Sequence, residues 1–156
     1  MLRKIILAAA TGAALALSPA AFAQQTEGYE AAAMLMNVVG EVKVNQQRAF
    51  DMFNEGGERF LNGDIYVFCF NAGDGKFVAM GNANAKDLLG KDVRTLKDET
   101  GNAYGQQIYT AGQKPEGEIT EVSYPFARAT DPKPADKTSF VTRVDNDFAC
   151  GVGYYK

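Results

Sequence analysis

The stretch Asp64-Ile-Tyr-Val-Phe-Cys-Phe70 decides the fold. Five of its seven residues are aromatic or β-branched, which is typical of a β-strand. In a strand, one side carries the rings and the other carries smaller apolar groups: Tyr66, Phe68 and Phe70 against Ile65, Val67 and Cys69. Because both sides are apolar, we expect a central strand in a sheet that is covered on both faces.

A helical pattern precedes this strand, from about Glu27 to Phe60. Apolar residues recur there at spacings of three, four and seven: Leu35, Val38, Val42, Ala49, Phe53 and Phe60. The pattern predicts one helix of roughly 30 residues that packs on the sheet. Gly40 and the Gly56-Gly57 pair are expected to mark bends or a frayed end. The same stripe also allows a dimerisation seam, although core packing is the commoner use of such a face.

Four more strands are expected after the first. A Gly/Asp turn at residues 71–75 leads back into Lys76–Met80, which makes a hairpin. Three further alternating segments follow near the C-terminus: 118–127, 137–145 and 147–155, the first two linked by the Pro-rich stretch 130–134.

The connection between the second and third strands, residues 81–117, reads as a flap with two short helices. Asn84 is expected to cap the first, which ends at Gly90. The second passes through Tyr104 and Ile108 and stops at Gly112. The whole order predicts an α+β fold: a long N-terminal helix behind a five-stranded antiparallel sheet, with the flap across the other face. A small-molecule pocket can form beneath such a flap.

The first 23 residues read as a secretion signal. Arg3 and Lys4 are followed by an uncharged run from Ile5 to Leu17, and Ala21-Phe22-Ala23 has the small-x-small pattern of a signal-peptidase site. The 13-residue run is shorter than the roughly 20 residues that cross a bilayer. We expect cleavage after Ala23, a single domain over residues 24–156, and a periplasmic or secreted location. An uncleaved anchor is the alternative.

Composition excludes several function classes. The chain has 156 residues and no histidine, which removes Ser-His-Asp and Cys-His catalysis and the commonest transition-metal ligand. A formal net charge of −3 without basic clusters argues against nucleic-acid binding. The acidic stretch 92–99 lacks the spacing of an EF-hand, so no metal and no cofactor are expected.

Cys69 and Cys150 are an even pair in a chain expected to be exported, so a disulfide is the first hypothesis. Both lie in strand-like segments, and a bridge requires those strands to be neighbours. The alternative is two buried free thiols. Neither cysteine is expected to be catalytic, because the sequence has no CxxC spacing.

Several segments together resemble one family across nearly the whole predicted mature chain. They occur in this order: residues 64–68 with Asp74-Gly75, Leu88–Asp92, Lys97-Asp98 with Gly101, Gly117, Tyr124-Pro-Phe126, Lys137–Val141 and Gly151–Tyr155. In this respect the chain resembles the single Cache domain, type 2, of bacterial extracytoplasmic sensors. The chain departs from that pattern at Met80-Gly81-Asn82, where relatives often carry His-Pro, and at Phe126, where a Trp is common.

The resemblance implies a PAS-like sheet whose first and last strands lie side by side at the centre, which favours the Cys69–Cys150 disulfide. It also implies recognition of a small molecule, often a short organic acid, by a non-catalytic domain. Most relatives continue into a kinase or chemotaxis module, whereas this sequence stops after its last predicted strand. We therefore expect any signal to pass through a separate membrane-bound partner, such as a sensor kinase or a chemoreceptor.

Seven residues are candidates for ligand binding. They are cations, an acid and pocket-lining apolar or aromatic residues near the flap: Tyr66, Phe68, Met80, Lys91, Asp98, Tyr124 and Lys137. Lys137 can pair with a carboxylate, or it can be a solvated lysine at a strand end. Lys91 also fits a helix C-terminal cap, and Asp98 a turn residue. The aromatic residues also fit a packed core.

The sequence therefore predicts a small-molecule sensor domain without catalytic activity. Two alternatives remain open. The first is an interaction protein that docks through its N-terminal helix, including as a homodimer. The second is an enzyme that uses Tyr, Lys or Asp as acid or base.

Overall fold

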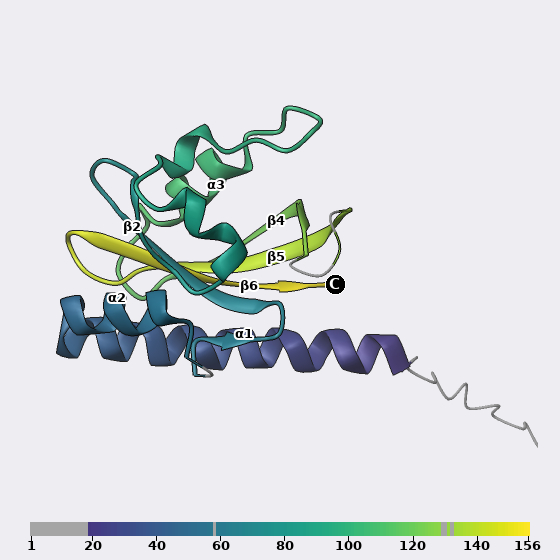
Figure 1. Ribbon diagram of the computed structural model, residues 1–156, viewed down its shortest axis with the longest axis horizontal. Coiled ribbons are helices and arrows are strands. Elements are labelled where there is room, and N and C mark those ends of the chain that lie inside the picture. The colour runs from purple at the N-terminus through teal and green to yellow at the C-terminus, as the bar shows by residue number, and fades with distance from the viewer. Residues whose placement is uncertain (1–18, 58, 129–130, 132) are drawn as a thin grey trace, which may run out of the picture.

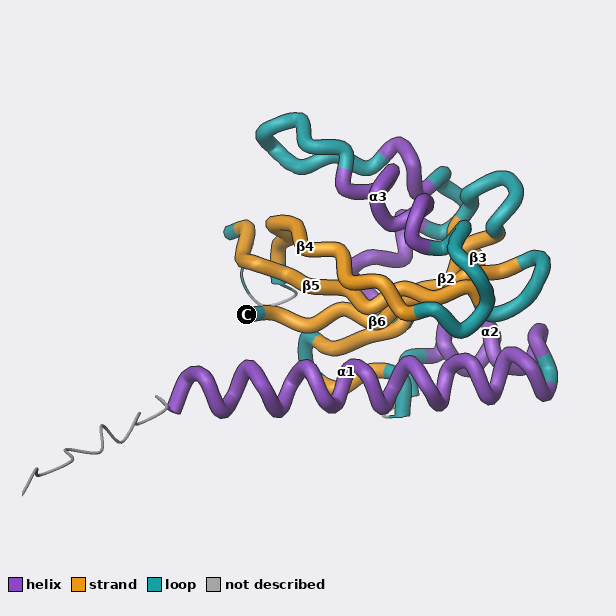
Figure 2. The backbone as a smooth tube through the Cα atoms, turned by 180° about the vertical axis from the view of Figure 1, so that it is seen from behind, coloured by secondary structure: helices purple, strands orange, loops and turns teal. Residues whose placement is uncertain are grey.

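The structure is a computed structural model that describes residues 19–57, 59–128, 131 and 133–156. The chain forms three layers, seen from opposite sides in Figures 1 and 2. Helices α1 (Pro19–Val44) and α2 (Gln46–Glu55) lie on one face of an antiparallel sheet, and a flap of short helices lies on the other. The strands are β1 (Leu61–Asn62), β2 (Ile65–Asn71), β3 (Phe77–Met80), β4 (Ile119–Ala127), β5 (Pro134–Arg143) and β6 (Phe148–Tyr155).

The sheet has the order β1-β2-β6-β5-β4, with β3 also paired to β2. All five predicted strands are confirmed, and so is the expected pairing of the first of them, β2, with the last, β6. Cys69 lies directly opposite Cys150 in this pairing, and the two form the predicted disulfide with a Cα–Cα distance of 4.1 Å. The sixth strand, β1, was not predicted, because a two-residue strand shows no periodicity.

The prediction of a single helix up to Phe60 is wrong, because the helix is interrupted at Asn45. This residue leaves helical geometry (φ −158°, ψ 101°), and its side-chain oxygen accepts a hydrogen bond from the backbone N–H of Arg48, which caps α2. The chain reverses there, so that α2 runs back beside the end of α1 (Figure 1). Gly56, expected to mark a bend or a frayed end, has φ 70° and closes α2 before the predicted limit near Phe60. No break occurs at Gly40, where α1 continues.

The predicted apolar stripe faces the sheet in spite of the break. One core cluster lies between the helices and the sheet and contains mostly aliphatic side chains together with both cysteines. From β2 it takes Ile65, Val67 and Cys69. A second core cluster lies between the sheet and the flap and takes Tyr66, Phe68 and Phe70 from the same strand. The alternation read from the sequence is therefore confirmed on both faces of β2.

The flap contains the 3-10 helices η1 (Ala83–Leu88) and η2 (Val93–Thr95) and the helix α3 (Tyr104–Ala111). The side chain of Asn82, not that of Asn84, caps η1 by accepting a hydrogen bond from the backbone N–H of Asn84. The helix over Tyr104 and Ile108 with its end at Gly112 is confirmed.

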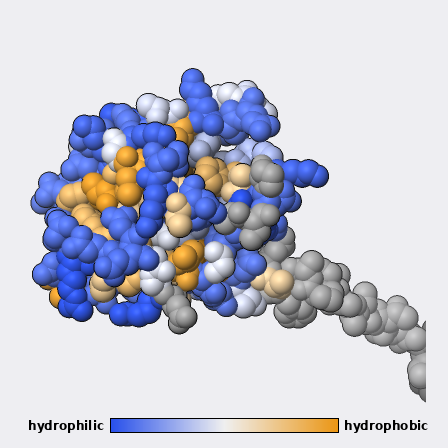
Figure 3. Space-filling model, in the orientation of Figure 1, coloured by the Kyte–Doolittle hydropathy of each residue, from blue (hydrophilic) through white to orange (hydrophobic). Residues whose placement is uncertain are grey.

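The predicted secretion signal falls largely outside the described residues. Its first 18 residues are not described, and residues 19–23 form the start of α1. Within the described part of the chain, no helix combines the length and apolarity needed to cross a bilayer. The face shown in Figure 3 is mostly hydrophilic, with hydrophobic residues exposed in patches between the hydrophilic ones.

Candidate functional site

A small hollow lies between the sheet and the flap, at the centre of the second core cluster. It has a volume of about 20 Å³, which is room for about one water molecule. We call it the inner hollow. Eleven side chains from the sheet and the flap line it: Tyr66, Phe68, Phe77, Met80, Leu88, Leu96, Tyr104, Ile108, Tyr124, Phe126 and Lys137. All but one of them are apolar or aromatic, so the lysine decides the chemistry of the hollow.

Lys137 lies on β5, where it pairs with Tyr124 of β4 on one side and Tyr155 of β6 on the other. Its side chain is only 2% exposed although it is a lysine. The Nζ atom donates a hydrogen bond to the hydroxyl of Tyr66 at 2.7 Å. It also lies 4.9 Å and 5.1 Å from the ring centres of Phe126 and Tyr155. The amine is therefore enclosed by aromatic rings, which attract its charged form.

Glycines in β6 provide the room for this arrangement. A Cβ atom on Gly153 would lie 2.3 Å from Cε and 3.1 Å from Nζ of Lys137. A Cβ atom on Gly151 would lie 2.4 Å from the ring of Phe68. The Gly-Val-Gly pattern of β6 thus leaves space on the flap side of the sheet, and Lys137 and Phe68 occupy it.

Burial and the lack of an anion control the protonation of Lys137. No carboxylate of the described residues lies within ion-pair distance of Nζ. The carboxylate that acts on the charge of Lys137 is that of Asp64, which already forms an ion pair with Arg128 at 2.8 Å. Burial lowers the pKa of Lys137 from its usual 10.5 to about 7, and the charge of Asp64 opposes this shift only in part. The site therefore holds a buried amine whose natural complement is an anion.

The tyrosines of the hollow are neutral at ordinary pH. The hydroxyls of Tyr124 and Ser139 form a hydrogen bond of 2.8 Å. Burial raises the pKa of Tyr66 and of Tyr124 above the usual range. Neutral phenols beside the amine can donate or accept a hydrogen bond, so they suit a polar group of a bound molecule.

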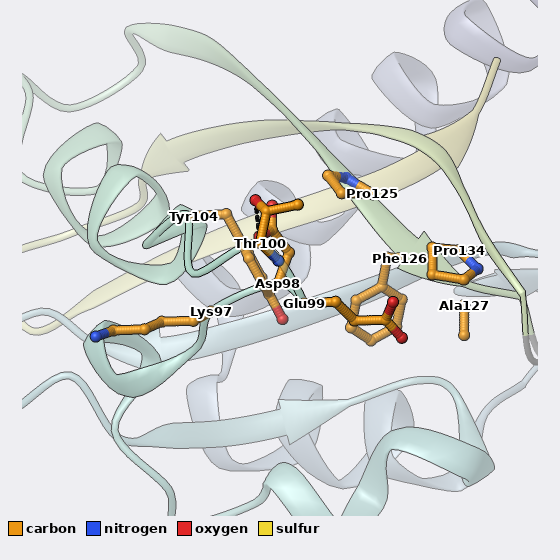
Figure 4. Close-up of a pocket in the computed structure, with 9 residues that line it drawn as sticks. All are labelled: Lys97, Asp98, Glu99, Thr100, Tyr104, Pro125, Phe126, Ala127 and Pro134. Atoms are coloured by element: carbon orange, nitrogen blue, oxygen red, sulfur yellow. Dashed lines mark hydrogen bonds between the residues drawn. The ribbon is translucent and has the colours of Figure 1, made fainter.

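Two aromatic side chains line both the inner hollow and a larger groove at the surface. Tyr104 stacks on Tyr124 with ring centres 4.3 Å apart and an angle of 7°, and Phe126 meets both rings edge-on. On their other side lies an open groove of about 300 Å³, which we call the outer groove (Figure 4). It is lined by Tyr104 and Phe126 together with the loop residues 97–100 and Pro125, Ala127 and Pro134.

The structure brings five of the seven predicted ligand residues to the inner hollow: Tyr66, Phe68, Met80, Tyr124 and Lys137. Asp98 lies on the outer groove instead, where its Oδ1 accepts hydrogen bonds from Thr100 and Asn102, which lower its pKa. Lys91 lies on the surface, where its Nζ bonds Asp87 at 3.2 Å. Neither Lys91 nor Asp98 lines the inner hollow, so their roles in ligand binding remain predictions.

The residues missed as site residues by sequence reasoning include Tyr104, Phe126 and Gly153. Tyr104 was predicted only as part of a helix, and nothing in the local pattern shows which face of that helix meets the sheet. Gly153 carried a signal that was not used: a glycine in the interior of a predicted strand often marks a close approach by another group.

The described residues include no group of three or more His, Cys, Asp or Glu side chains that could hold a metal ion. The arrangement suits binding: one buried cation, three phenols and an apolar wall. The predicted absence of catalysis remains a prediction.

No protein-family profile matches the sequence, and no curated protein matches it. Solved structures do. A methyl-accepting chemotaxis protein from Vibrio parahaemolyticus has 23% identity and a TM-score of 0.64, over 86% of this chain and 91% of that one. A Cache chemosensory domain from a study of carboxylic acid recognition has 17% identity and a TM-score of 0.59, over 89% of this chain and 99% of that domain.

A third structure, the periplasmic sensor domain of a chemotaxis protein, has 16% identity and a TM-score of 0.59, over 86% of this chain and 93% of the other. At these identities the likeness concerns the fold. The chain therefore has the fold of the Cache sensor domains.

Proposed function

We propose that this protein is an extracytoplasmic sensor domain that binds a short organic acid in the inner hollow without transforming it. The observation that carries the proposal is Lys137, a buried amine enclosed by aromatic rings with no carboxylate partner among the described residues. Burying a cation without an anion is unfavourable, and a ligand carboxylate would supply the missing charge. The similar Cache chemosensory domain studied for carboxylic acid recognition supports the same ligand class.

In this proposal five residues of the hollow contact the acid. Lys137 pairs with the carboxylate, and the hydroxyls of Tyr66 and Tyr124 orient its oxygens. Phe68 and Met80 contact the apolar part of the acid. Residues 1–23 act as a cleaved secretion signal that places the domain in the periplasm. A membrane-bound kinase or chemoreceptor then reads the bound state.

The test is a titration of the purified protein with acetate and propionate at pH 6.5, followed by calorimetry and thermal unfolding. We expect binding by the natural protein and binding ten- to a hundredfold weaker in Lys137→Met, because a hydrogen bond to a charged group contributes about 1.5–3 kcal/mol. At a ligand concentration a hundred times Kd, the natural protein gains about 2.7 kcal/mol of stability.

Two controls separate lost binding from lost folding. Lys137→Met removes a buried charge, so the unliganded variant is expected to be at least as stable as the natural protein. Lys133→Met makes the same change at an exposed residue near the start of the same strand and leaves binding unchanged. Equal affinity in the natural protein and Lys137→Met would contradict the proposal, as would the absence of any binding.

A second candidate function rests on a separate observation on α1. Tyr29 and Met36, seven residues apart on this helix, are 68% and 63% exposed. Large apolar side chains exposed on one helix face fit an interaction surface. In this candidate the helix holds a partner protein or a second copy of the chain. Light scattering tests it: a dimer that Met36→Glu converts to a monomer supports it, and a monomeric natural protein contradicts the homodimer.

A further inference from the structure

Three cavities meet at the same two side chains. Tyr104 and Phe126 line the inner hollow, the outer groove and a third cavity of about 270 Å³ beside η1. These two rings therefore form the wall that the inner hollow shares with the two larger cavities. Acetate needs more room than one water molecule, so a wall side chain must move when an acid enters the hollow.

The backbone of Tyr104 is fixed. It is the first residue of α3, and the next residue, Gly105, lies so close to η2 that a Cβ atom there would be 1.9 Å from the carbonyl oxygen of Val93. The N–H of Gly105 also donates a hydrogen bond to the carbonyl of Leu96 at 3.2 Å. Rotation of the side chain can therefore open the wall, whereas movement of the helix would separate closely packed backbones.

The side chain of Tyr104 is less restrained than those of its neighbours. Across the described part of the chain, its hydroxyl has no hydrogen-bond partner, whereas those of Tyr66 and Tyr124 are both bonded. Its ring is held by the stack on Tyr124 and by the edge of Phe126. Phe126 itself borders the amine of Lys137 at 4.9 Å, so it belongs to the enclosure of the charge.

The space into which the ring can turn is the outer groove. Figure 4 shows Tyr104 beside Asp98 and Thr100, the loop residues that border this groove. Once the ring turns outward, the inner hollow and the groove form one continuous site. A short acid would allow the ring to close again, and a longer acid would hold it open.

We propose that Tyr104 sets the upper size limit of the acid that the inner hollow accepts. This inference rests on the proposed function, because it presumes a carboxylate bound at Lys137. It goes further by assigning a specificity-determining role to a residue of the flap: Tyr104 favours acids of two or three carbons and disfavours longer or aromatic acids.

The experiment compares chain-length profiles. Acetate, propionate, butyrate, hexanoate and phenylacetate are titrated by calorimetry into the natural protein, Tyr104→Phe, Tyr104→Ala and Tyr109→Ala. We expect the natural protein and Tyr104→Phe to prefer acetate or propionate over hexanoate by at least about tenfold, since single methylenes change affinity by such factors in a fitted pocket. In Tyr104→Ala this preference is expected to disappear or reverse.

Tyr109→Ala is the matched control. Tyr109 lies on the same helix, but its hydroxyl donates to the carbonyls of Ala72 and Gly73, and it does not line the inner hollow. This variant loses a tyrosine from α3 and should keep the natural chain-length profile, which separates a local effect at Tyr104 from a general loosening of the flap.

Four results would overturn the inference. A natural protein that binds hexanoate as tightly as acetate has no size limit to explain. If Tyr104→Ala leaves the chain-length profile unchanged, or if Tyr109→Ala changes it equally, Tyr104 does not set the size limit. In these cases, and in the case of equal affinity for hexanoate and acetate, acid binding at Lys137 still stands. If no acid binds the natural protein, the proposed function fails and the inference fails with it.

Discussion

The two faces of the sheet are built from the same strands but differ in kind. The face toward α1 and α2 is packed with mostly aliphatic side chains and a few aromatic rings around the disulfide between Cys69 and Cys150. The face toward the flap contains tyrosines, phenylalanines, a buried lysine and a hollow. The helix face is closely packed, whereas the flap face holds an incompletely filled hollow and a buried charge without a carboxylate partner among the described residues. Under the proposed function, the helix face stabilises the fold and the flap face binds the acid.

The largest effect should come from breaking the helix face. Replacing both cysteines by alanine removes a bridge between residues 81 apart, and we expect a loss of about 4 kcal/mol in the free energy of unfolding. Urea denaturation measures this loss. Under native conditions, acid affinity should stay within about twofold. A large loss of affinity in a variant that is still folded would contradict the division between the two faces.

A change on the flap face should mainly weaken acid binding and reduce stability less than loss of the disulfide does. Gly153→Ala places a methyl group against Cε and Nζ of Lys137, the flexible end of that side chain, and forces the amine to shift. We expect acid affinity to fall at least about tenfold, with a stability loss of about 1–3 kcal/mol. Calorimetry and urea denaturation on the same sample give both values. Unchanged affinity would show that the position of the amine is unimportant.

Acid binding should depend on pH because the buried amine of Lys137, on the flap face, titrates near neutral pH. Because burial lowers the pKa of Lys137 to about 7, the free amine loses its proton as the pH rises through that value. A bound carboxylate favours the ammonium form, so affinity should fall by up to about tenfold per pH unit above pH 7, with proton uptake on binding. Titrations at pH 6, 7 and 8 in two buffers test this. Affinity that does not change with pH would contradict it.

The stability of the unliganded protein should have the opposite pH dependence. A lysine whose folded pKa lies below its unfolded value of 10.5 binds fewer protons in the folded state. Stability should therefore rise between pH 7 and about 10. Above that range it should fall, because the buried tyrosines, whose pKa values are raised, resist ionisation in the folded state. Lys137→Met should lack the rise, as urea denaturation at several pH values would show.

The smallest effect is expected at Lys91. Its Nζ pairs with Asp87 on the surface, where both side chains are more than half exposed. Lys91→Ala should cost less than about 0.5 kcal/mol and leave acid affinity unchanged. Weaker binding in this variant would return Lys91 to the site and would show that the ligand extends beyond the inner hollow.

The sequence alone predicted most of the layers and part of the site. Alternation in residues 64–70 identified a central strand with two different faces, and this is what the structure shows. The break at Asn45 was not predicted because the apolar stripe continues across it. The side chain of Asn45 accepts a hydrogen bond from the backbone N–H of Arg48, and such side-chain bonds compete with a continuous helix. Lys137 could be proposed as a ligand residue, but its burial depends on Gly153 of the neighbouring strand, and that pairing is a property of the fold.

The most direct test of the central claim is a crystal structure of the protein grown with propionate at pH 6.5. The account predicts a carboxylate in the inner hollow within about 3 Å of Lys137 Nζ, with the ring of Tyr104 displaced from its stack on Tyr124 or closed over the acid. A hollow that stays as small as it is here under saturating propionate, or an acid bound elsewhere on the molecule, would contradict it.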